Sequence, residues 1–300
     1  MEKDYLFCPV CERKTKSCYS KKYKGKSELF YKKDLYQCLA CKIIFTHPLP
    51  HPPELDQYYK TIWLRDENII SLSKEAESVY KIQGDVRCDY LIRHNAVGEG
   101  FKLLDIGSGY GYFFRSLQNR SIKNLIFFAT DPSPICLEKL KKIGVNAFDS
   151  LSEISEKNFD LITLGQVLEH IPNPNSFLKS IIKLVRSGGH IYIDVPYRDD
   201  THKTLFEPHL LFYSKESLLN LVNNLNLKVI HVTGFGVKRS NFIFPKILFH
   251  RISTKIKSVL RTIFTSAPMN EQLERKLYDR YQFDQEGEEG WWIRIILRVY

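Results

Sequence analysis

The sequence lacks any run approaching the ~18 consecutive apolar residues of a membrane-spanning helix, and it has no internal repeat or low-complexity tract. Its opening residues have neither the basic start nor the apolar middle of a secretory signal peptide, so we expect a cytoplasmic protein. Disorder is excluded because 43% of the 300 residues are hydrophobic and only 26% are charged. A formal charge of +10 favours anionic partners but does not choose among nucleic acid, phosphorylated molecules and an acidic membrane surface.

The chain divides into three parts of different composition. Residues 1–47 hold five of the seven cysteines, and residues 48–100 contain a proline-rich joint, where helix is disfavoured, and a cap of two helices. Across residues 101–300, short apolar runs alternate with segments of helical spacing, which predicts βαβ units and a parallel sheet. The expected strands are 102–106, 124–130, 159–164, 190–195, 227–232 and 291–299, and the expected helices are 112–118, 135–143, 175–185 and 214–223.

Two Cys-x2-Cys pairs near the N-terminus predict a zinc-ribbon-like domain. The first pair is Cys8 and Cys11, the second is Cys38 and Cys41, and 26 residues separate them. Two such turns can close a tetrahedron of sulfurs around Zn²⁺. Structural zinc contributes on the order of 10–16 kcal/mol of apparent folding free energy, enough to order a segment with little apolar content. A saturated four-thiolate site has no open position, so we assign it no catalytic role.

A glycine-rich turn stands between an expected strand and an expected helix at residues 103–111. Dinucleotide-binding turns have their third glycine one position later, where this chain has Tyr112, and they face a pyrophosphate. Here Asp105 places a carboxylate two residues before Gly107, where it would repel a phosphate and attract a cation. S-adenosylmethionine, which joins adenosine to an ammonium and a sulfonium group, fits this pattern.

Acidic residues after the next two apolar runs extend the predicted cofactor site. Asp131 would accept hydrogen bonds from both ribose hydroxyls, and Asp149, after the run 144–148, would take the adenine amino group. The predicted cofactor-binding residues are Asp105, Gly107, Ser108, Gly109, Asp131, Pro132, Asp149 and Gln166.

These motifs resemble those of the class I S-adenosylmethionine-dependent methyltransferases. Residues 104–111 match the first motif of that family, 131–132 the second, 159–171 the fourth-strand motif and 187–189 the turn before strand five. The resemblance covers about residues 100–233 and the final strand. It implies an α/β fold with a Rossmann-like, seven-stranded, mostly parallel sheet whose last strand is antiparallel.

Methyl acceptors bind beyond the carboxyl ends of the parallel strands, which places the loop 196–213 at the predicted site. His209 is the preferred general base because a near-neutral imidazole can accept a hydroxyl proton, although a structural role fits it equally well. His170 and Tyr197 complete the predicted catalytic set.

A zinc-ribbon N-terminus on this core resembles bacterial methyltransferases that act on sugars, including nucleotide-sugar C-methyltransferases. Those enzymes have a Tyr and a Glu-His pair where residues 206–209 here read Phe-Glu-Pro-His. The loss of the Tyr and of the adjacent Glu favours O-methylation of a sugar hydroxyl in a bacterial surface glycan or its nucleotide- or lipid-linked precursor. The second hypothesis is an RNA methyltransferase whose zinc finger binds RNA. The third hypothesis is a non-catalytic scaffold that depends on zinc, and the intact glycine turn argues against it.

Two basic segments lie outside these motifs. Residues 13–33 carry nine Lys or Arg against one acidic residue, and residues 237–269 carry seven against none. The first segment is either a solvated loop or a polyanion-binding one. The second belongs to an expected insertion at 236–288 and contains an amphipathic helix. That helix is either a lid or homodimer helix, or a contact of 242–264 with the inner membrane face or a lipid-diphosphate-linked glycan.

Overall fold

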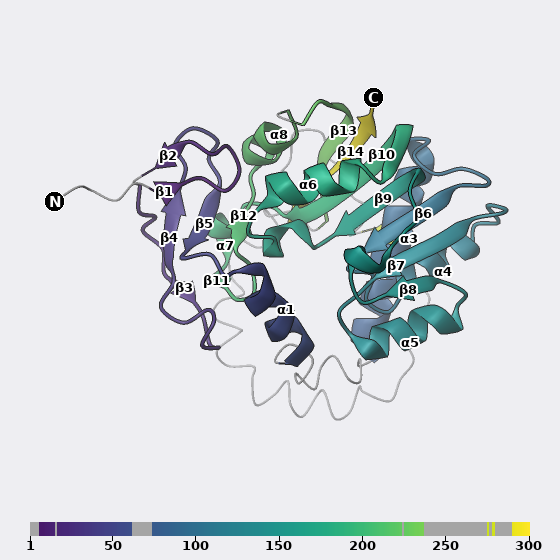
Figure 1. Cartoon of the computed structure of the whole chain (residues 1–300), viewed down its shortest axis with the longest axis horizontal. Coiled ribbons are helices and arrows are strands. Elements are labelled where there is room, and N and C mark those ends of the chain that lie inside the picture. The colour runs from purple at the N-terminus through teal and green to yellow at the C-terminus, as the bar shows by residue number, and fades with distance from the viewer. Residues whose placement is uncertain are drawn as a thin grey trace.

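The computed structural model describes residues 6–15, 17–61, 74–223, 225–236, 275, 278–279 and 290–300. A seven-stranded sheet with helices on both faces forms its centre (Figure 1). The expected amphipathic helix and the segment 242–264 lie outside the described residues, so both stay predictions.

The central sheet has the strand order β13-β14-β10-β9-β6-β7-β8. Strands β6, β7, β8, β9 and β10 pair with one another in parallel, whereas β14 runs antiparallel to both β10 and β13. The prediction of a mostly parallel sheet with an antiparallel last strand is confirmed. The bounds are β6 Lys102–Ile106, β7 Ile126–Thr130, β8 Asn146–Phe148, β9 Phe159–Gly165, β10 Val185–Pro196, β13 Leu227–Phe235 and β14 Trp292–Val299.

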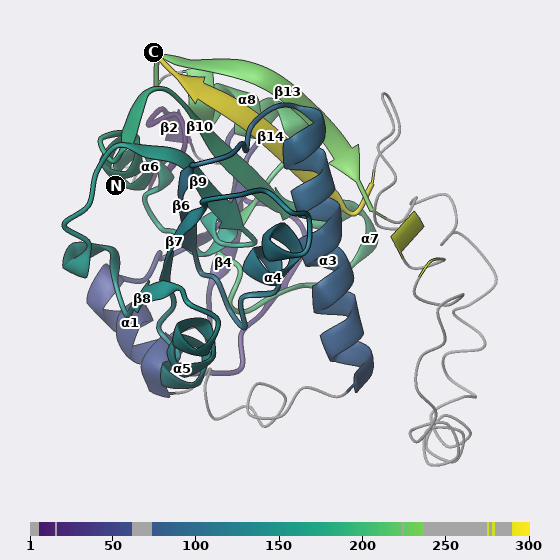
Figure 2. The ribbon, with the colours of Figure 1, turned by 90° about the vertical axis from the view of Figure 1, so that its right-hand side faces the viewer.

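Helices cover both faces of this sheet because the central strands are apolar on both sides. In β6, Leu103 packs in the cluster with α3 (Lys74–Arg93), α4 (Tyr112–Gln118) and α5 (Pro134–Lys142), and α3 lies beside α4 (Figure 2). Its neighbour Leu104 packs in the opposite cluster, with α6 and α8. The helices α6 and α8 span Pro174–Ile182 and Lys215–Asn223, close to their expected positions.

The first helix, α1 (Pro52–Thr61), begins inside the proline cluster rather than after it. The expectation that helix is disfavoured throughout residues 48–53 is therefore wrong for its last two prolines. Proline is accepted in the first turn of a helix because the N–H that it lacks would have no helical partner there.

The cysteine-rich segment forms short strands that pair with the acceptor-side loop. Its strands are β1 Leu6–Phe7, β2 Lys14–Thr15, β3 Tyr23–Lys24, β4 Asp34–Gln37 and β5 Ile44–His47. Strand β3 pairs with β11 (Leu205–Phe206), and β5 pairs with β12 (Leu211–Phe212). Cys8 and Ile193 belong to one continuous apolar core. The segment thus packs against the same sheet that positions the predicted site.

Candidate functional site

The glycine turn follows β6 and leads directly into α4. Gly107 and Gly109 adopt positive φ angles of 69° and 55°, a conformation that residues with a Cβ rarely adopt. A Cβ on Gly107 would also lie 2.6 Å from Cγ2 of Val167, in the loop that follows β9. Around Gly109, in contrast, an added Cβ would meet nothing within 4 Å. The turn therefore approaches its neighbouring loop closely at Gly107 and leaves open space above Gly109.

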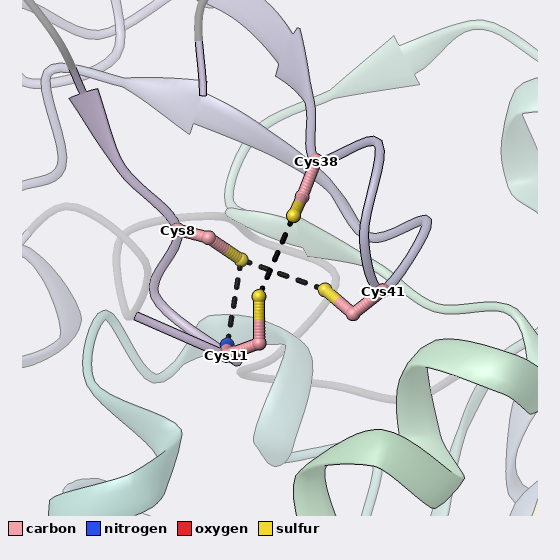
Figure 3. Close-up of side chains that lie close together, drawn as sticks. All are labelled: Cys8, Cys11, Cys38 and Cys41. Atoms are coloured by element: carbon pink, nitrogen blue, oxygen red, sulfur yellow. Dashed lines mark hydrogen bonds between the residues drawn. The ribbon is translucent and has the colours of Figure 1, made fainter. Parts of the chain in front are cut away.

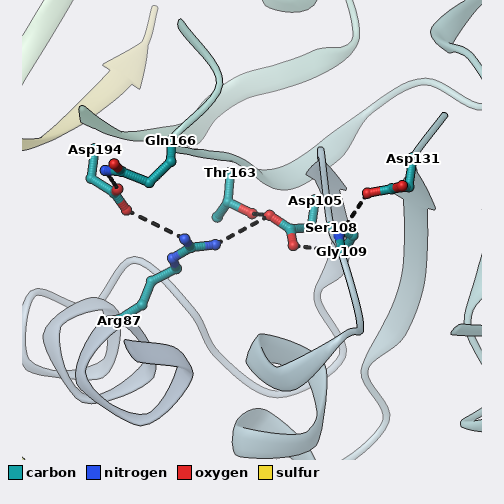
Figure 4. A network of polar contacts seen from close by, with 8 residues as sticks. All are labelled: Arg87, Asp105, Ser108, Gly109, Asp131, Thr163, Gln166 and Asp194. Atoms are coloured by element: carbon teal, nitrogen blue, oxygen red, sulfur yellow. Dashed lines mark hydrogen bonds and ion pairs between the residues drawn. The ribbon is translucent and has the colours of Figure 1, made fainter. Parts of the chain in front are cut away.

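Asp105 lies at the end of β6 and is 2% exposed. Its carboxylate accepts hydrogen bonds from Ser108 Oγ at 2.6 Å and Thr163 Oγ1 at 2.5 Å, and Arg87 Nη1 lies 3.4 Å away (Figure 4). Burial raises the pKa of Asp105, and Arg87 and the two hydroxyls oppose that rise. The predicted negative charge at this position is therefore held in a buried network.

Arg87 of α3 bridges two strand ends, and no sequence motif marks this residue. Its Nη2 lies 3.4 Å from Oδ2 of Asp194, at the end of β10, whose Oδ1 accepts a hydrogen bond from Gln166 Nε2 at 2.6 Å. A Cβ on Gly165 would lie 1.6 Å from Arg87 Nη2, so this glycine provides the space for the guanidinium. The pocket here is lined by Gln83, Arg87, Gln166, Tyr192, Asp194, Phe235 and Trp292.

Asp131 follows β7 and stabilises the glycine turn through hydrogen bonds. Its carboxylate accepts hydrogen bonds from the backbone N–H of Gly109 at 2.7 Å and of Ser133 at 2.9 Å. Burial raises the pKa of Asp131, and these two bonds oppose the rise. Pro132 stands between Asp131 and Ser133, which caps α5. Asp149 follows β8 and pairs with Lys60 of α1 at 3.6 Å on the surface.

On the acceptor side, the structure brings the two predicted histidines together. The rings of His170 and His209 are 4.9 Å apart, and Nδ1 of His209 lies 3.8 Å from Oδ2 of Asp199. Burial lowers the pKa of His170 to about 3, so this imidazole is neutral. For Tyr197 the structure shows backbone contacts: its N–H donates to the carbonyl of Trp291 at 2.9 Å.

The four predicted metal-ligating cysteines also converge (Figure 3). The sulfurs of Cys8 and Cys41 are 3.5 Å apart, as are those of Cys11 and Cys38, and all four lie within 4.8 Å of one another. Zn–S bonds of about 2.3 Å in a tetrahedron imply sulfur spacings of about 3.8 Å, so the residues fit Zn²⁺. The thiol of Cys41 lowers the pKa of Cys8 to about 5, while burial raises that of Cys11 to about 11.

Both cysteine turns have the same backbone geometry. Cys8 and Cys38 each accept, through their carbonyls, an N–H four residues later, at 2.9 and 2.8 Å. Those later residues, Glu12 and Lys42, have positive φ angles of 59° and 64°. Two matching turns that present their sulfurs to one point support ligation of a single ion.

The cysteine-rich segment also holds the loop that carries His209. One carboxylate oxygen of Glu207 accepts hydrogen bonds from the N–H of Lys26 at 2.8 Å and from the N–H and hydroxyl of Ser27, both at 3.0 Å. Tyr23 donates its hydroxyl to the carbonyl of His209 at 3.0 Å. No sequence pattern indicates these contacts, because their partners lie about 180 residues apart.

Comparison with known proteins agrees with this architecture. A family model described as "Methyltransferase domain" matches residues 73–232, more than half of the chain. The chain belongs to this family. It is an S-adenosylmethionine-dependent methyltransferase with the class I α/β fold. No helix among the described residues is long and apolar enough to cross a membrane.

Individual relatives of this methyltransferase are distant. A ubiquinone biosynthesis O-methyltransferase from Photobacterium profundum is 23% identical over 175 residues, which span 50% of this chain and 73% of the relative. Its counterpart from Erwinia tasmaniensis is 27% identical over 43% of this chain and 55% of the relative. A solved methyltransferase from Thermotoga maritima, described as a possible histamine N-methyltransferase, covers 81% of this chain and 98% of its own at 15% identity and a TM-score of 0.48.

Proposed function

We propose that this methyltransferase transfers a methyl group to a sugar hydroxyl in a bacterial surface glycan or its nucleotide- or lipid-linked precursor. The observation that carries the proposal is the contact between His209 and the buried carboxylate of Asp199, beside neutral His170, beyond the ends of β9 and β10. This is the position at which an acceptor meets the cofactor in doubly wound sheets.

The residues around the glycine turn fit S-adenosylmethionine. The open space over Gly109 admits the ligand, and the carboxylate of Asp131 would accept hydrogen bonds from its ribose. Asp105 would pair with the ammonium of the methionine part, and Arg87, already between two carboxylates, would pair with its carboxylate. When bound, the cofactor supplies an electrophilic methyl group on sulfur.

His209 serves as the base in this proposal. Asp199 faces Nδ1 of the ring, which favours a proton there and leaves Nε2 with a lone pair for the acceptor hydroxyl. Lys203 lies 2.8 Å from the same carboxylate oxygen and keeps Asp199 charged. The O-methyltransferases among the relatives support oxygen as the accepting atom. The choice of a sugar rests on the cysteine-rich N-terminus joined to this core.

Zinc has a structural part in this proposal. Four thiolates would hold the ion, and the ion would order the segment whose strands β3 and β5 pair with the acceptor-side loop. No reaction step passes through it.

The test is a transfer assay with the full-length protein and S-adenosylmethionine that carries a tritiated methyl group. The acceptors offered are nucleotide sugars, a lipid-diphosphate-linked glycan, a catechol and ribosomal RNA. We expect label in an O-methyl ether on a sugar, identified by mass spectrometry of the product. Label only in RNA or only in the catechol would contradict the proposal.

A further inference from the structure

Glu169 is a buried carboxyl group whose oxygens accept no hydrogen bond from the described residues. It is 1% exposed, and neither of its carboxylate oxygens has a hydrogen-bond partner within the described part of the chain. An ionised carboxylate taken out of water without hydrogen bonds or a counter-ion is strongly unfavourable. Its position therefore requires either a proton or a cation.

Two imidazoles lie close enough to share such a cation. Nε2 of His170 is 3.7 Å from Oε1 of Glu169, and the ligand atoms of Glu169, His170 and His209 all lie within 4.8 Å of one another. Bonds of about 2.1 Å to one ion bring neighbouring ligand atoms to about 3.0–3.4 Å. A small contraction of the three side chains reaches that geometry.

The outer nitrogens of both rings face hydrogen-bond acceptors. Nδ1 of His170 lies 3.3 Å from the carbonyl oxygen of Pro208, and Nδ1 of His209 lies 3.8 Å from the carboxylate of Asp199. Histidines that bind metals almost always donate their second N–H to a carbonyl or a carboxylate, which fixes the tautomer and leaves the other nitrogen for the ion. His170 has that hydrogen bond, and His209 has a carboxylate facing its outer nitrogen at a slightly longer distance.

We propose that Glu169, His170 and His209 form a second metal site, distinct from the four cysteines, which binds a divalent transition ion such as Mn²⁺, Co²⁺ or Zn²⁺. One carboxylate and two imidazoles suit these ions better than Mg²⁺ or Ca²⁺, which prefer oxygen ligands. Three protein ligands leave coordination positions open to a further ligand.

The consequence for catalysis rests on the proposed function. An ion bound to Nε2 of His209 occupies the lone pair that His209 needs as a base. Metal at this site therefore slows methyl transfer and acts as a regulator of the same site.

The test uses Mn²⁺ as the probe, because thiolate sites prefer softer ions and the cysteine site stays loaded with zinc. Electron paramagnetic resonance measures free Mn²⁺ in titrations of the full-length wild type, Glu169→Gln and His51→Gln, a matched control at an exposed histidine. We expect one Mn²⁺ on the wild type and on His51→Gln, and binding at least about tenfold weaker in Glu169→Gln. No binding to the wild type, or equal binding by Glu169→Gln, overturns the proposal.

Thermal unfolding of the same samples shows that the variant is folded. Without Mn²⁺, Glu169→Gln should still unfold cooperatively near the wild-type temperature, because the neutral amide matches the size of the carboxyl group that it replaces. With Mn²⁺, only the wild type and His51→Gln should gain stability, as ligand linkage requires. A Mn²⁺-dependent gain of the same size in Glu169→Gln contradicts the site. A parallel titration with S-adenosylhomocysteine tests the cofactor half of the proposed function alone, since its failure would leave the metal result standing.

Discussion

The two halves of the site are assembled from the chain in different ways. On the cofactor side, the contacts around Asp105 and Asp131 join residues that mostly lie within about 25 positions of each other, such as Ser108 and Gly109. On the acceptor side, His209 is held by Tyr23 and Glu207 by Ser27, across about 180 positions. The cofactor half can thus form with the sheet alone, whereas the acceptor half also needs the cysteine-rich segment.

The difference teaches that the cysteine-rich segment and the loop 196–213 form one structural unit. Strands β3 and β5 pair with β11 and β12 on either side of His209, so any disorder of the segment is transmitted to the loop. The following predictions test this division, beginning with the largest expected effect.

Cys41→Ser should impair the acceptor half of the site and leave the cofactor half intact. If the four cysteines hold zinc as proposed, loss of the buried Cys41 thiol removes most of the ~10–16 kcal/mol that a structural zinc contributes, so the cysteine-rich segment should unfold. Methyl transfer should fall at least about 10²-fold because the acceptor loop is misplaced. S-adenosylhomocysteine should still bind, as measured by calorimetry, while hydrogen exchange reports the loss of β3 and β5.

Cys18→Ser is the matched control, because Cys18 is exposed and lies outside the cluster of four cysteines. It should keep its zinc, its methyl transfer and its cofactor affinity. Equal loss of cofactor binding and transfer in Cys41→Ser would show that the two halves do not fold independently.

His209→Gln should affect chemistry without affecting the fold. Removal of a general base lowers the rate by typically about 10²–10⁴-fold, so kcat should fall by that factor while the affinity for S-adenosylhomocysteine stays unchanged. Asp199→Asn should give a smaller loss of about tenfold or more, since it removes the carboxylate that orients the ring. A His209→Gln variant with wild-type kcat would remove His209 from the mechanism.

The contrast between local and long-range contacts also explains which site residues could be predicted from the sequence. Asp105, Gly107 and Asp131 were predicted together because a strand, a turn and a helix encode their positions locally. The two Cys-x2-Cys pairs were predicted to meet because two such turns in one short segment are typical of a single metal site. Arg87 was missed because nothing in a helical segment marks one arginine for burial between two distant carboxylates. Such pairs depend on packing across the sheet.

In protein with no metal ion bound to His170, acid should destabilise the fold through this residue. Its pKa is about 3 in the folded protein, against about 6.5 in the unfolded chain, so the unfolded state takes up a proton first as the pH falls. Between pH 7.5 and 5.0 this residue alone should lower the free energy of unfolding by about 2 kcal/mol. Urea denaturation of His170→Gln should show a correspondingly smaller pH dependence, whereas His51→Gln should match the wild type. An unchanged pH dependence in His170→Gln would mean that this imidazole is not buried as a neutral group.

Arg87→Lys tests whether the cofactor is bound by a residue outside the glycine-turn motif. A lysine can reach one carboxylate but cannot bridge Asp105 and Asp194 as the planar guanidinium does. If Arg87 pairs with the methionine carboxylate, the affinity for S-adenosylhomocysteine should weaken about tenfold, by about 1.4 kcal/mol, while adenosine binding changes little. Arg93→Lys, at the exposed end of the same helix, is the matched control and should bind both ligands normally. Equal weakening for adenosine and S-adenosylhomocysteine would instead mean that Arg87 supports the strand ends rather than the ligand, and the cofactor half would then be as local as its sequence motif.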